Sequence, residues 1–203
     1  MRRIIIVGIG TGIGKTVASS VLVEALKADY WKPIQCGDLD NSDTKVVGSL
    51  VSNEKSVFHQ ESYRLKGYKS PHAAASEENI LIDLNRLYVP DTKNTLIIEP
   101  PGGLMVPLNN TDLVIDLLQL FDGEVVLVSQ NYLGSINHTL LTAGALQSRG
   151  FNVLGIIFNG EPNKDSEEII LKITELPMLG RIELEDKVNK KMILKYAPEF
   201  VNV

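Results

Sequence analysis

The stretch from residue 4 to residue 16 constrains the fold of this chain more than any other. An apolar run, IIIVGI, leads into a glycine-rich loop that ends in Gly14-Lys15-Thr16, and helix-forming sequence follows at once. This order predicts a buried strand, a phosphate-binding loop and the N-terminus of a helix. Glycine lets backbone N–H groups close around phosphate oxygens, and the helix dipole adds positive potential there. Lys15 would reach the outer phosphates, and the Thr16 hydroxyl would face a magnesium ion.

The spacing of this loop narrows the choice of ligand. Gly8 and Gly14 are separated by five residues, one more than in the usual phosphate-binding loop. The dinucleotide pattern G-x-G-x-x-G, started at Gly8, fails because Ile13 stands at its last glycine. The Gly-Lys-Thr ending favours a nucleoside triphosphate instead. The residues expected to contact the nucleotide here are Gly12, Ile13, Gly14, Lys15, Thr16 and Val17.

Composition excludes several classes of protein. A net charge of −5 argues against a general nucleic-acid binder, which usually has a basic surface. The single cysteine, Cys36, allows no internal disulfide and favours a reducing compartment. The apolar run at residues 4–9 is too short for a membrane span or the core of a signal peptide. We therefore expect one domain over residues 1–203, cytoplasmic, with neither a nucleic acid nor a membrane as partner.

Apolar runs rich in valine and isoleucine alternate with helical patterns along the whole chain. The expected strands are residues 3–9, 30–35, 95–99, 124–129, 152–158 and 177–182. The expected helices are residues 15–28, 43–50, a segment beginning at 71, 85–88, 111–120, 135–147, 166–173 and 188–196. Residues 52–70 are polar and weakly patterned. The predicted fold class is α/β: a three-layer sandwich with a mostly parallel sheet, as in P-loop nucleoside triphosphate hydrolases.

Polar residues at the strand ends indicate where a ligand would bind, because ligands of such sheets lie outside the carboxyl ends of the strands. The segments expected to converge on one crevice are the phosphate-binding loop and residues 32–37, 99–103, 129–135 and 159–160. Thr16, Asp43 and Glu99 would offer hard oxygen ligands for magnesium. Asp43 alone is equally well explained as the cap of a helix. Glu99 ends an apolar strand, so a metal or a lysine should accompany it.

Several of these segments, in this order, resemble the dethiobiotin synthetase family. The family shares the five-residue spacing between Gly8 and Gly14. The other matching segments are Lys32-Pro33-Ile34-Gln35-Cys36-Gly37, Asn41-Ser42-Asp43, Ser70-Pro71-His72, Glu99 with Gly102-Gly103, Leu133-Gly134-Ser135-Ile136-Asn137-His138, and Asn159. The matches run from residue 3 to about residue 183, nearly the whole chain.

The resemblance implies a reaction. The family closes the cyclic urea of dethiobiotin from 7,8-diaminononanoate, carbon dioxide (or bicarbonate) and ATP, with Mg²⁺. A carbamate forms first, ATP phosphorylates its oxygen, and the second amine closes the ring and expels phosphate. A homodimer is also implied, with the substrate carboxylate near the subunit interface.

The resemblance also assigns roles to residues. Lys15 and Lys32 would stabilise the transferring phosphoryl group, although Lys32 is also explained as a surface lysine before a turn proline. Gly102, Asn159 and Gly160 would add to the nucleotide site. Substrate contacts are expected from Thr11, Cys36, Gly134, Ser135, Ile136 and Asn137. The last four residues begin a predicted helix, whose free N–H groups suit a carboxylate, and a plain helix start explains them too.

Some positions depart from the family pattern. Gly10 and Gly12 replace side chains that relatives carry in the loop, and Cys36 replaces a hydroxyl with a weaker hydrogen-bonding thiol. Pro100-Pro101 removes two backbone donors after Glu99.

Two other classes of protein are alternatives to a dethiobiotin synthetase. Partition and septum-placing ATPases carry a second lysine where Gly10 stands, which argues against a switch of that type. An amide-forming ligase of the cobyrinic acid type would need room for a glutaminase domain. A guanine-reading motif is missing, because Asn159 is followed by Gly160-Glu161-Pro162.

Overall fold

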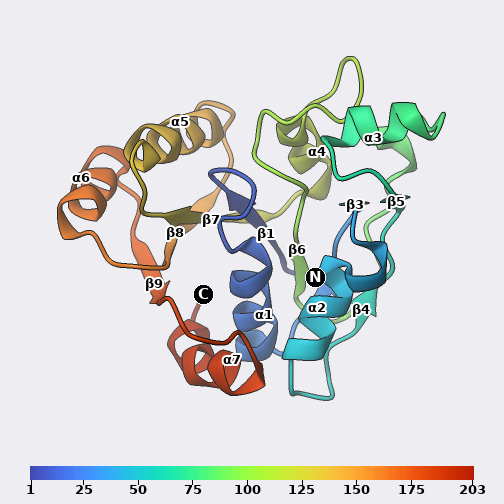
Figure 1. The fold of residues 1–203 in the computed structure, drawn as a ribbon. Coiled ribbons are helices and arrows are strands. Elements are labelled where there is room, and N and C mark those ends of the chain that lie inside the picture. The colour runs from blue at the N-terminus through green and yellow to red at the C-terminus, as the bar shows by residue number, and fades with distance from the viewer.

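A seven-stranded parallel sheet forms the centre of the protein (Figure 1). The computed structural model describes residues 1–203. The strand order is β4-β2-β6-β1-β7-β8-β9, and every neighbouring pair is parallel. The strands are β1 (Arg3–Gly8), β2 (Asp29–Trp31), β4 (Phe58–His59), β6 (Leu96–Ile98), β7 (Glu124–Gln130), β8 (Val153–Asn159) and β9 (Met178–Ile182). The inner strands are almost wholly buried, as continuous apolar runs require when helices cover both faces.

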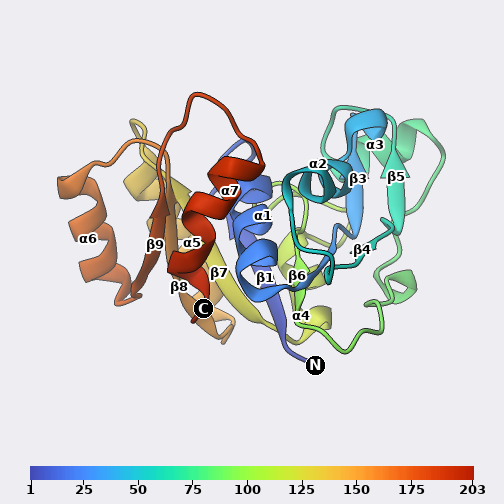
Figure 2. The ribbon, with the colours of Figure 1, turned by 90° about the horizontal axis from the view of Figure 1, so that it is seen from below.

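Helices cover the two faces of this sheet. Figures 1 and 2 show α1 (Lys15–Leu26), α2 (Asp43–Leu50) and α7 (Lys190–Tyr196) on one side, with α4 (Val114–Phe121) and α5 (Ser135–Ser148) on the other. The helix α6 (Lys164–Thr174) packs beside α5. Three short 3-10 turns are η1 (Leu39–Asn41), η2 (Leu84–Arg86) and η3 (Ala197–Phe200). The predicted three-layer α/β sandwich is confirmed. No helix has the length and apolar character needed to cross a bilayer.

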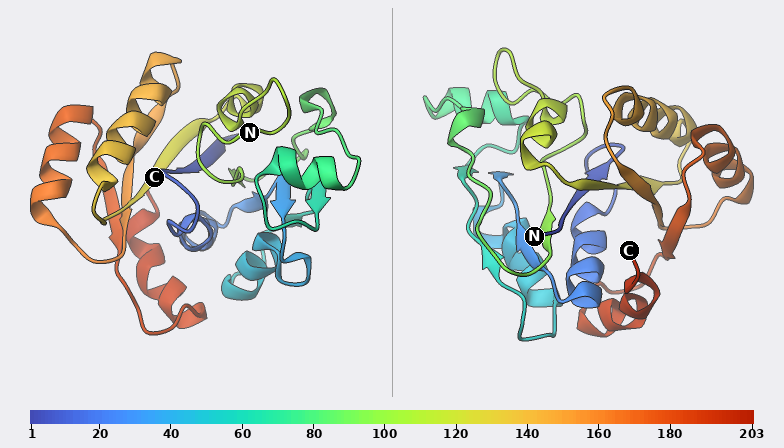
Figure 3. Two further views of the ribbon diagram at one scale, coloured as in Figure 1. Left: turned by 45° about the horizontal axis from the view of Figure 1, so that its top comes forward. Right: turned by 180° about the vertical axis from the view of Figure 1, so that it is seen from behind.

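The single strand predicted over residues 30–35 is wrong. The chain forms β2 in the main sheet, leaves it at Lys32 and Pro33, and continues as β3 (Ile34–Cys36). Proline has no N–H group and cannot continue a ladder inside a sheet, which explains the break. The strand β3 pairs in parallel with β5 (Tyr63–Leu65) in a separate two-stranded sheet. Figure 3 shows this small sheet and α3 (Pro71–Glu77) at the end of the molecule away from β8 and β9.

Other differences concern the ends of elements. The polar segment 52–70 contains two short strands, β4 and β5, that its weak pattern did not indicate. The helix α1 ends two residues before the predicted limit, at Leu26, because Lys27 takes a left-handed conformation with φ 52°. The helix α4 begins at Val114, where the Leu113 N–H donates to Asp116, and not at residue 111 as predicted.

The register of three strands positions the polar residues that follow them. Trp31 of β2 lies opposite Ile98 of β6, and Ile98 lies opposite Ile5 of β1. The next residues along β2 and β6 are Lys32 and Glu99, so these two side chains emerge next to each other. Trp31 also packs edge-on against Phe121 of α4, with ring centroids 5.5 Å apart, which fixes the sheet against that helix.

Candidate active site

A cleft of about 640 Å³ opens beyond the carboxyl ends of β1, β2 and β6. Most of the segments predicted to converge do line it. Its lining residues include Thr11, Gly12, Gly14, Lys15, Thr16, Val17, Lys32, Cys36, Asp43, Glu99 and Gly102. Residues 68–71, which follow β5, form the opposite wall. The prediction that several strand ends share one crevice therefore holds for the β1, β2 and β6 ends.

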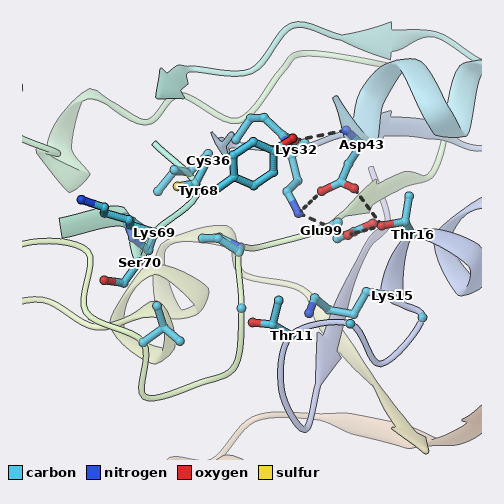
Figure 4. Close-up of a pocket in the computed structure, with 18 of the residues that line it drawn as sticks. Thr11, Lys15, Thr16, Lys32, Cys36, Asp43, Tyr68, Lys69, Ser70 and Glu99 are labelled. Atoms are coloured by element: carbon cyan, nitrogen blue, oxygen red, sulfur yellow. Dashed lines mark hydrogen bonds and ion pairs between the residues drawn. The ribbon is translucent and has the colours of Figure 1, made fainter. Parts of the chain in front are cut away.

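Lys32 stands between two carboxylates in this cleft (Figure 4). Its ammonium lies 2.6 Å from Asp43 Oδ2 and 3.2 Å from Glu99 Oε1, and the residue is only 5% exposed. Burial works to lower the pKa of Lys32, but the Glu99 and Asp43 carboxylates outweigh burial and raise that pKa. Lys32 is therefore a buried, protonated cation and not a surface lysine before a turn.

Two residues that sequence reasoning missed hold Glu99 in place. Glu99 is 1% exposed, and its Oε2 accepts hydrogen bonds from Ser19 at 2.8 Å and from the Tyr30 hydroxyl at 3.0 Å. Burial and the Glu99 carboxylate raise the pKa of Tyr30, which remains a donor. The sequence could have indicated the contact between Tyr30 and Glu99, because a tyrosine within a buried strand needs a partner for its hydroxyl.

Asp43 begins α2 without capping it. The Asp43 N–H donates to Gln35 Oε1 at 3.1 Å, so the cap comes from β3. The carboxylate of Asp43 turns toward the cleft and accepts from the Thr16 hydroxyl at 2.9 Å. The same hydroxyl lies 3.0 Å from Glu99 Oε1. The alternative explanation of Asp43 as a helix cap is therefore wrong, since its side chain makes no capping bond.

Lys15 lies at the floor of the cleft and is 7% exposed. Its ammonium donates to the Gly10 carbonyl at 2.8 Å. Burial lowers the pKa of Lys15 to about 8, with neighbouring Lys32 adding to this effect and Glu99 opposing it. A lysine with this pKa is mostly protonated at neutral pH, yet it is poorly solvated, so an added anion would be a favourable partner.

Gly14 shows why the loop needs glycine. Its φ is +92°, and a Cβ there would come within 2.2 Å of Asn159 Nδ2. Asn159 reaches the loop from the end of β8 and donates to the Ile13 carbonyl at 3.0 Å. Asn159 thus lies against the loop, and neither Asn159 nor the adjacent Gly160 lines the main cleft. Their role toward a nucleotide base stays a prediction.

The start of α5 lies outside the main cleft. None of Gly134, Ser135, Ile136 and Asn137 lines it. A second hollow of about 620 Å³ lies between residues 103–106 and α5, with His138 and Leu141 in its wall, and Thr11 borders both hollows. The expectation that the β7 end joins the same crevice is therefore wrong, because the phosphate-binding loop stands between the two spaces.

Cys36 lines the main cleft from the end of β3. Burial raises the pKa of the Cys36 thiol to about 11, so the thiol is neutral at physiological pH. A neutral thiol is a weak nucleophile, and the side chain therefore offers a contact surface.

The chain matches a family model described as "AAA domain" over residues 2–192. Among curated proteins it is 49% identical to an ATP-dependent dethiobiotin synthetase BioD of Cytophaga hutchinsonii, over 97% of this chain and 96% of that protein. An ATP-dependent dethiobiotin synthetase BioD of Christiangramia forsetii is also 49% identical, covering 96% of this chain and 94% of that protein.

Solved structures share the fold. The cell division ATPase MinD of Pyrococcus furiosus superposes with a TM-score of 0.63 at 17% identity, covering 98% of each chain. A ParA family ATPase of Chlorobium tepidum gives a TM-score of 0.59 at 14% identity, covering 97% of each chain. Identities this low support a common fold and say nothing of a common activity.

Proposed function

The chain belongs to the ATP-dependent dethiobiotin synthetase family, and on that premise we propose how its residues divide the reaction. It is an ATP-dependent ligase of biotin biosynthesis that closes the ureido ring of dethiobiotin. The observation that carries this conclusion is 49% identity over nearly the full length of both chains. The cleft agrees with it, because two buried lysines and two carboxylates meet beside a phosphate-binding loop.

We propose that the reaction passes through a carbamate. One amine of 7,8-diaminononanoate adds to carbon dioxide and loses a proton, which gives a carbamate, and a carbamate oxygen then attacks the γ-phosphorus of ATP. The bond between that phosphorus and the bridging oxygen breaks, and ADP leaves with the electron pair. The second amine attacks the carbonyl carbon of the resulting anhydride, loses its proton as the ring closes, and expels phosphate. The carbamate and the phosphates of ATP are all negatively charged, so the protein's main tasks are to neutralise this charge and to hold the reacting groups in place.

Lys15 and Lys32 are the cations placed for that task. Lys15 would exchange its bond to the Gly10 carbonyl for the transferring phosphoryl group. Lys32 is held from the other side of the cleft by Asp43 and Glu99 at 2.6 and 3.2 Å, which fixes its ammonium before any substrate binds. Fixed donors cost no reorganisation during the reaction, and this favours the transition state.

Thr16, Asp43 and Glu99 fit a magnesium ion. The Thr16 hydroxyl lies within hydrogen-bond distance of both carboxylates, and oxygen ligands of this kind are those that magnesium prefers. Magnesium would supply charge neutralisation on the phosphates of ATP. The set contains two carboxylates and one hydroxyl, and no group of three or more histidine, cysteine, aspartate or glutamate side chains gathers here or elsewhere in the protein. Ser19 and Tyr30 keep the Glu99 carboxylate aimed at the cleft.

The far end of the substrate would use the second hollow. We assign the substrate carboxylate to the N–H groups of Ile136 and Asn137 in the first turn of α5, which precede His138 in the wall of this hollow; the Ser135 N–H already donates to the Tyr132 carbonyl at 2.9 Å. Thr11 borders both this hollow and the main cleft. Exposed apolar side chains surround this region, including Leu133, Leu141 and Met105. They support a homodimer in which a second copy covers the hollow. Sedimentation of the purified protein tests that assembly.

The decisive test of the activity mixes the purified protein with the diamine, ATP, magnesium and bicarbonate. We expect dethiobiotin and ADP to form together, and neither to form when the diamine is left out. ATP turnover that does not depend on the diamine would contradict the ligase and favour a nucleotide-driven switch.

A further inference from the structure

Tyr68 forms a wall between two spaces. It lines the main cleft together with Lys32 and Glu99. It also lines a neighbouring open hollow of about 450 Å³, whose other residues include Asp38 and Asp40. Tyr68 is the one residue common to both linings. Both spaces open to solvent, and its side chain therefore covers the reacting end of the cleft only on the side of this neighbouring hollow.

The backbone around Tyr68 is held firmly. A Cβ on Gly37, whose φ is +72°, would lie 2.6 Å from the Tyr68 ring, so the ring rests directly on that peptide. The Gly37 N–H donates to the Leu65 carbonyl at 2.8 Å. The Lys66 N–H donates to Glu78 at 2.7 Å. The ring thus rests with one side on a fixed peptide, and 76% of the residue is exposed.

The position of the ring matters for the chemistry. Figure 4 shows Tyr68 beside Lys32 and Cys36, at the place where the proposed phosphoryl transfer occurs. Partial desolvation and then the neighbouring Asp38 raise the pKa of Tyr68, so the side chain is a neutral phenol near neutral pH. An uncharged ring presents an apolar face to the cleft, and nothing on that face activates water.

We propose that Tyr68 shields the carbamic-phosphoric anhydride from water and so couples ATP use to ring closure. This inference rests on the proposed carbamate route. Without the shield, water attacks the carbonyl carbon of the anhydride, the carbon–oxygen bond to phosphate breaks, and phosphate leaves with the electron pair. The carbamic acid left behind loses carbon dioxide and returns the diamine. The net result is hydrolysis of ATP to ADP and phosphate without product. Exclusion of water from reactive intermediates is a recognised task of closed sites.

The shielding is measured directly by the coupling ratio, which is the amount of phosphate released per dethiobiotin formed. The intact enzyme should release one phosphate per product. Tyr68→Ala removes the wall and joins the two spaces, so the ratio should rise at least about threefold. Tyr68→Phe keeps the ring and loses only the hydroxyl, so its ratio should stay near that of the intact enzyme. A structural defect alone would lower both rates and leave the ratio unchanged.

The matched control is Tyr88→Ala. Tyr88 is 78% exposed, close to the value for Tyr68, and lines neither space. Each variant is assayed for phosphate and dethiobiotin in the same reaction, after subtraction of a reaction without diamine, and is checked for folding by thermal unfolding. An unchanged ratio in a folded Tyr68→Ala variant would overturn the proposal, as would an equal rise in Tyr88→Ala. Failure of the intact enzyme to make dethiobiotin is a separate outcome, which would contradict the proposed activity itself.

Discussion

Replacing Lys32 by methionine should destabilise the protein strongly, because it removes the only cation paired with two carboxylates, of which Glu99 is fully buried and Asp43 half-buried. The Lys32 ammonium lies 2.6 Å from Asp43 and 3.2 Å from Glu99. At an effective dielectric constant of about 20, each attraction is on the order of 5–6 kcal/mol. Desolvation of the three groups offsets much of that sum, and breaking a buried pair typically costs about 3–5 kcal/mol net.

The assay is thermal unfolding followed by circular dichroism, with a chelator present. A chain of this length loses about 2–4 °C per kcal/mol, so Lys32→Met should lower Tm by about 6–20 °C. Lys187→Met, at an exposed lysine, is the control and should change Tm by little. Combining Lys32→Met with Glu99→Gln should recover part of the loss, because less uncompensated charge stays buried. A Tm of Lys32→Met within about 2 °C of the intact protein would refute the ion-cluster argument.

The remaining predictions concern the loop, the cleft thiol and a carboxylate at the opposite end of the sheet. Gly14→Ala places a methyl group against Asn159 and should lower kcat/KM for ATP by about 10²-fold, whereas Gly144→Ala, whose Cβ would meet nothing within 4 Å, should leave it unchanged. Because the pKa of Cys36 is about 11, iodoacetamide should modify the folded protein at pH 8 on the order of 10²-fold more slowly than the urea-unfolded chain; equal rates would be inconsistent with a raised thiol pKa. Burial works to raise the pKa of Asp29, but hydrogen bonds from its neighbours outweigh burial and lower it, so its stabilisation is present above the usual value of 3.8 and is lost as the pH falls through the lower, folded pKa. Asp29→Asn should therefore cost about 1.5–3 kcal/mol in urea unfolding at pH 7, with the difference shrinking under acid; a difference independent of pH would argue against this role.

The sequence predicted the centre of the fold well because that centre obeys local rules. The run before Gly8 is apolar without interruption, and the loop and helix that follow it are specified by adjacent residues. The magnesium-type set of Thr16, Asp43 and Glu99 was also predicted, and the structure brings the three side chains together. Residues at the ends of neighbouring parallel strands must lie close to one another, so the topology alone is enough to gather them.

Contacts between residues that lie far apart in the sequence could not be predicted. Nothing local says that Gln35 supplies the cap of α2, because the bond joins residues from two different elements. Ser19 and Tyr30 serve Glu99 through contacts that depend on strand order. The separation of the α5 start from the main cleft likewise depends on the path of the phosphate-binding loop in space.

Transfer of a carbamate oxygen to phosphate is the central chemical claim, and isotope tracing tests it most directly. The enzyme is supplied with the diamine, ATP, magnesium and carbon dioxide carrying ¹⁸O at both oxygens, in a reaction too short for exchange with water. A carbamate oxygen that attacks the γ-phosphorus stays with that phosphorus when the ring closes. The released phosphate should therefore contain one ¹⁸O atom for each dethiobiotin formed. Unlabelled phosphate accompanying dethiobiotin would show that no carbamate oxygen was phosphorylated, and would contradict the mechanism proposed for Lys15 and Lys32.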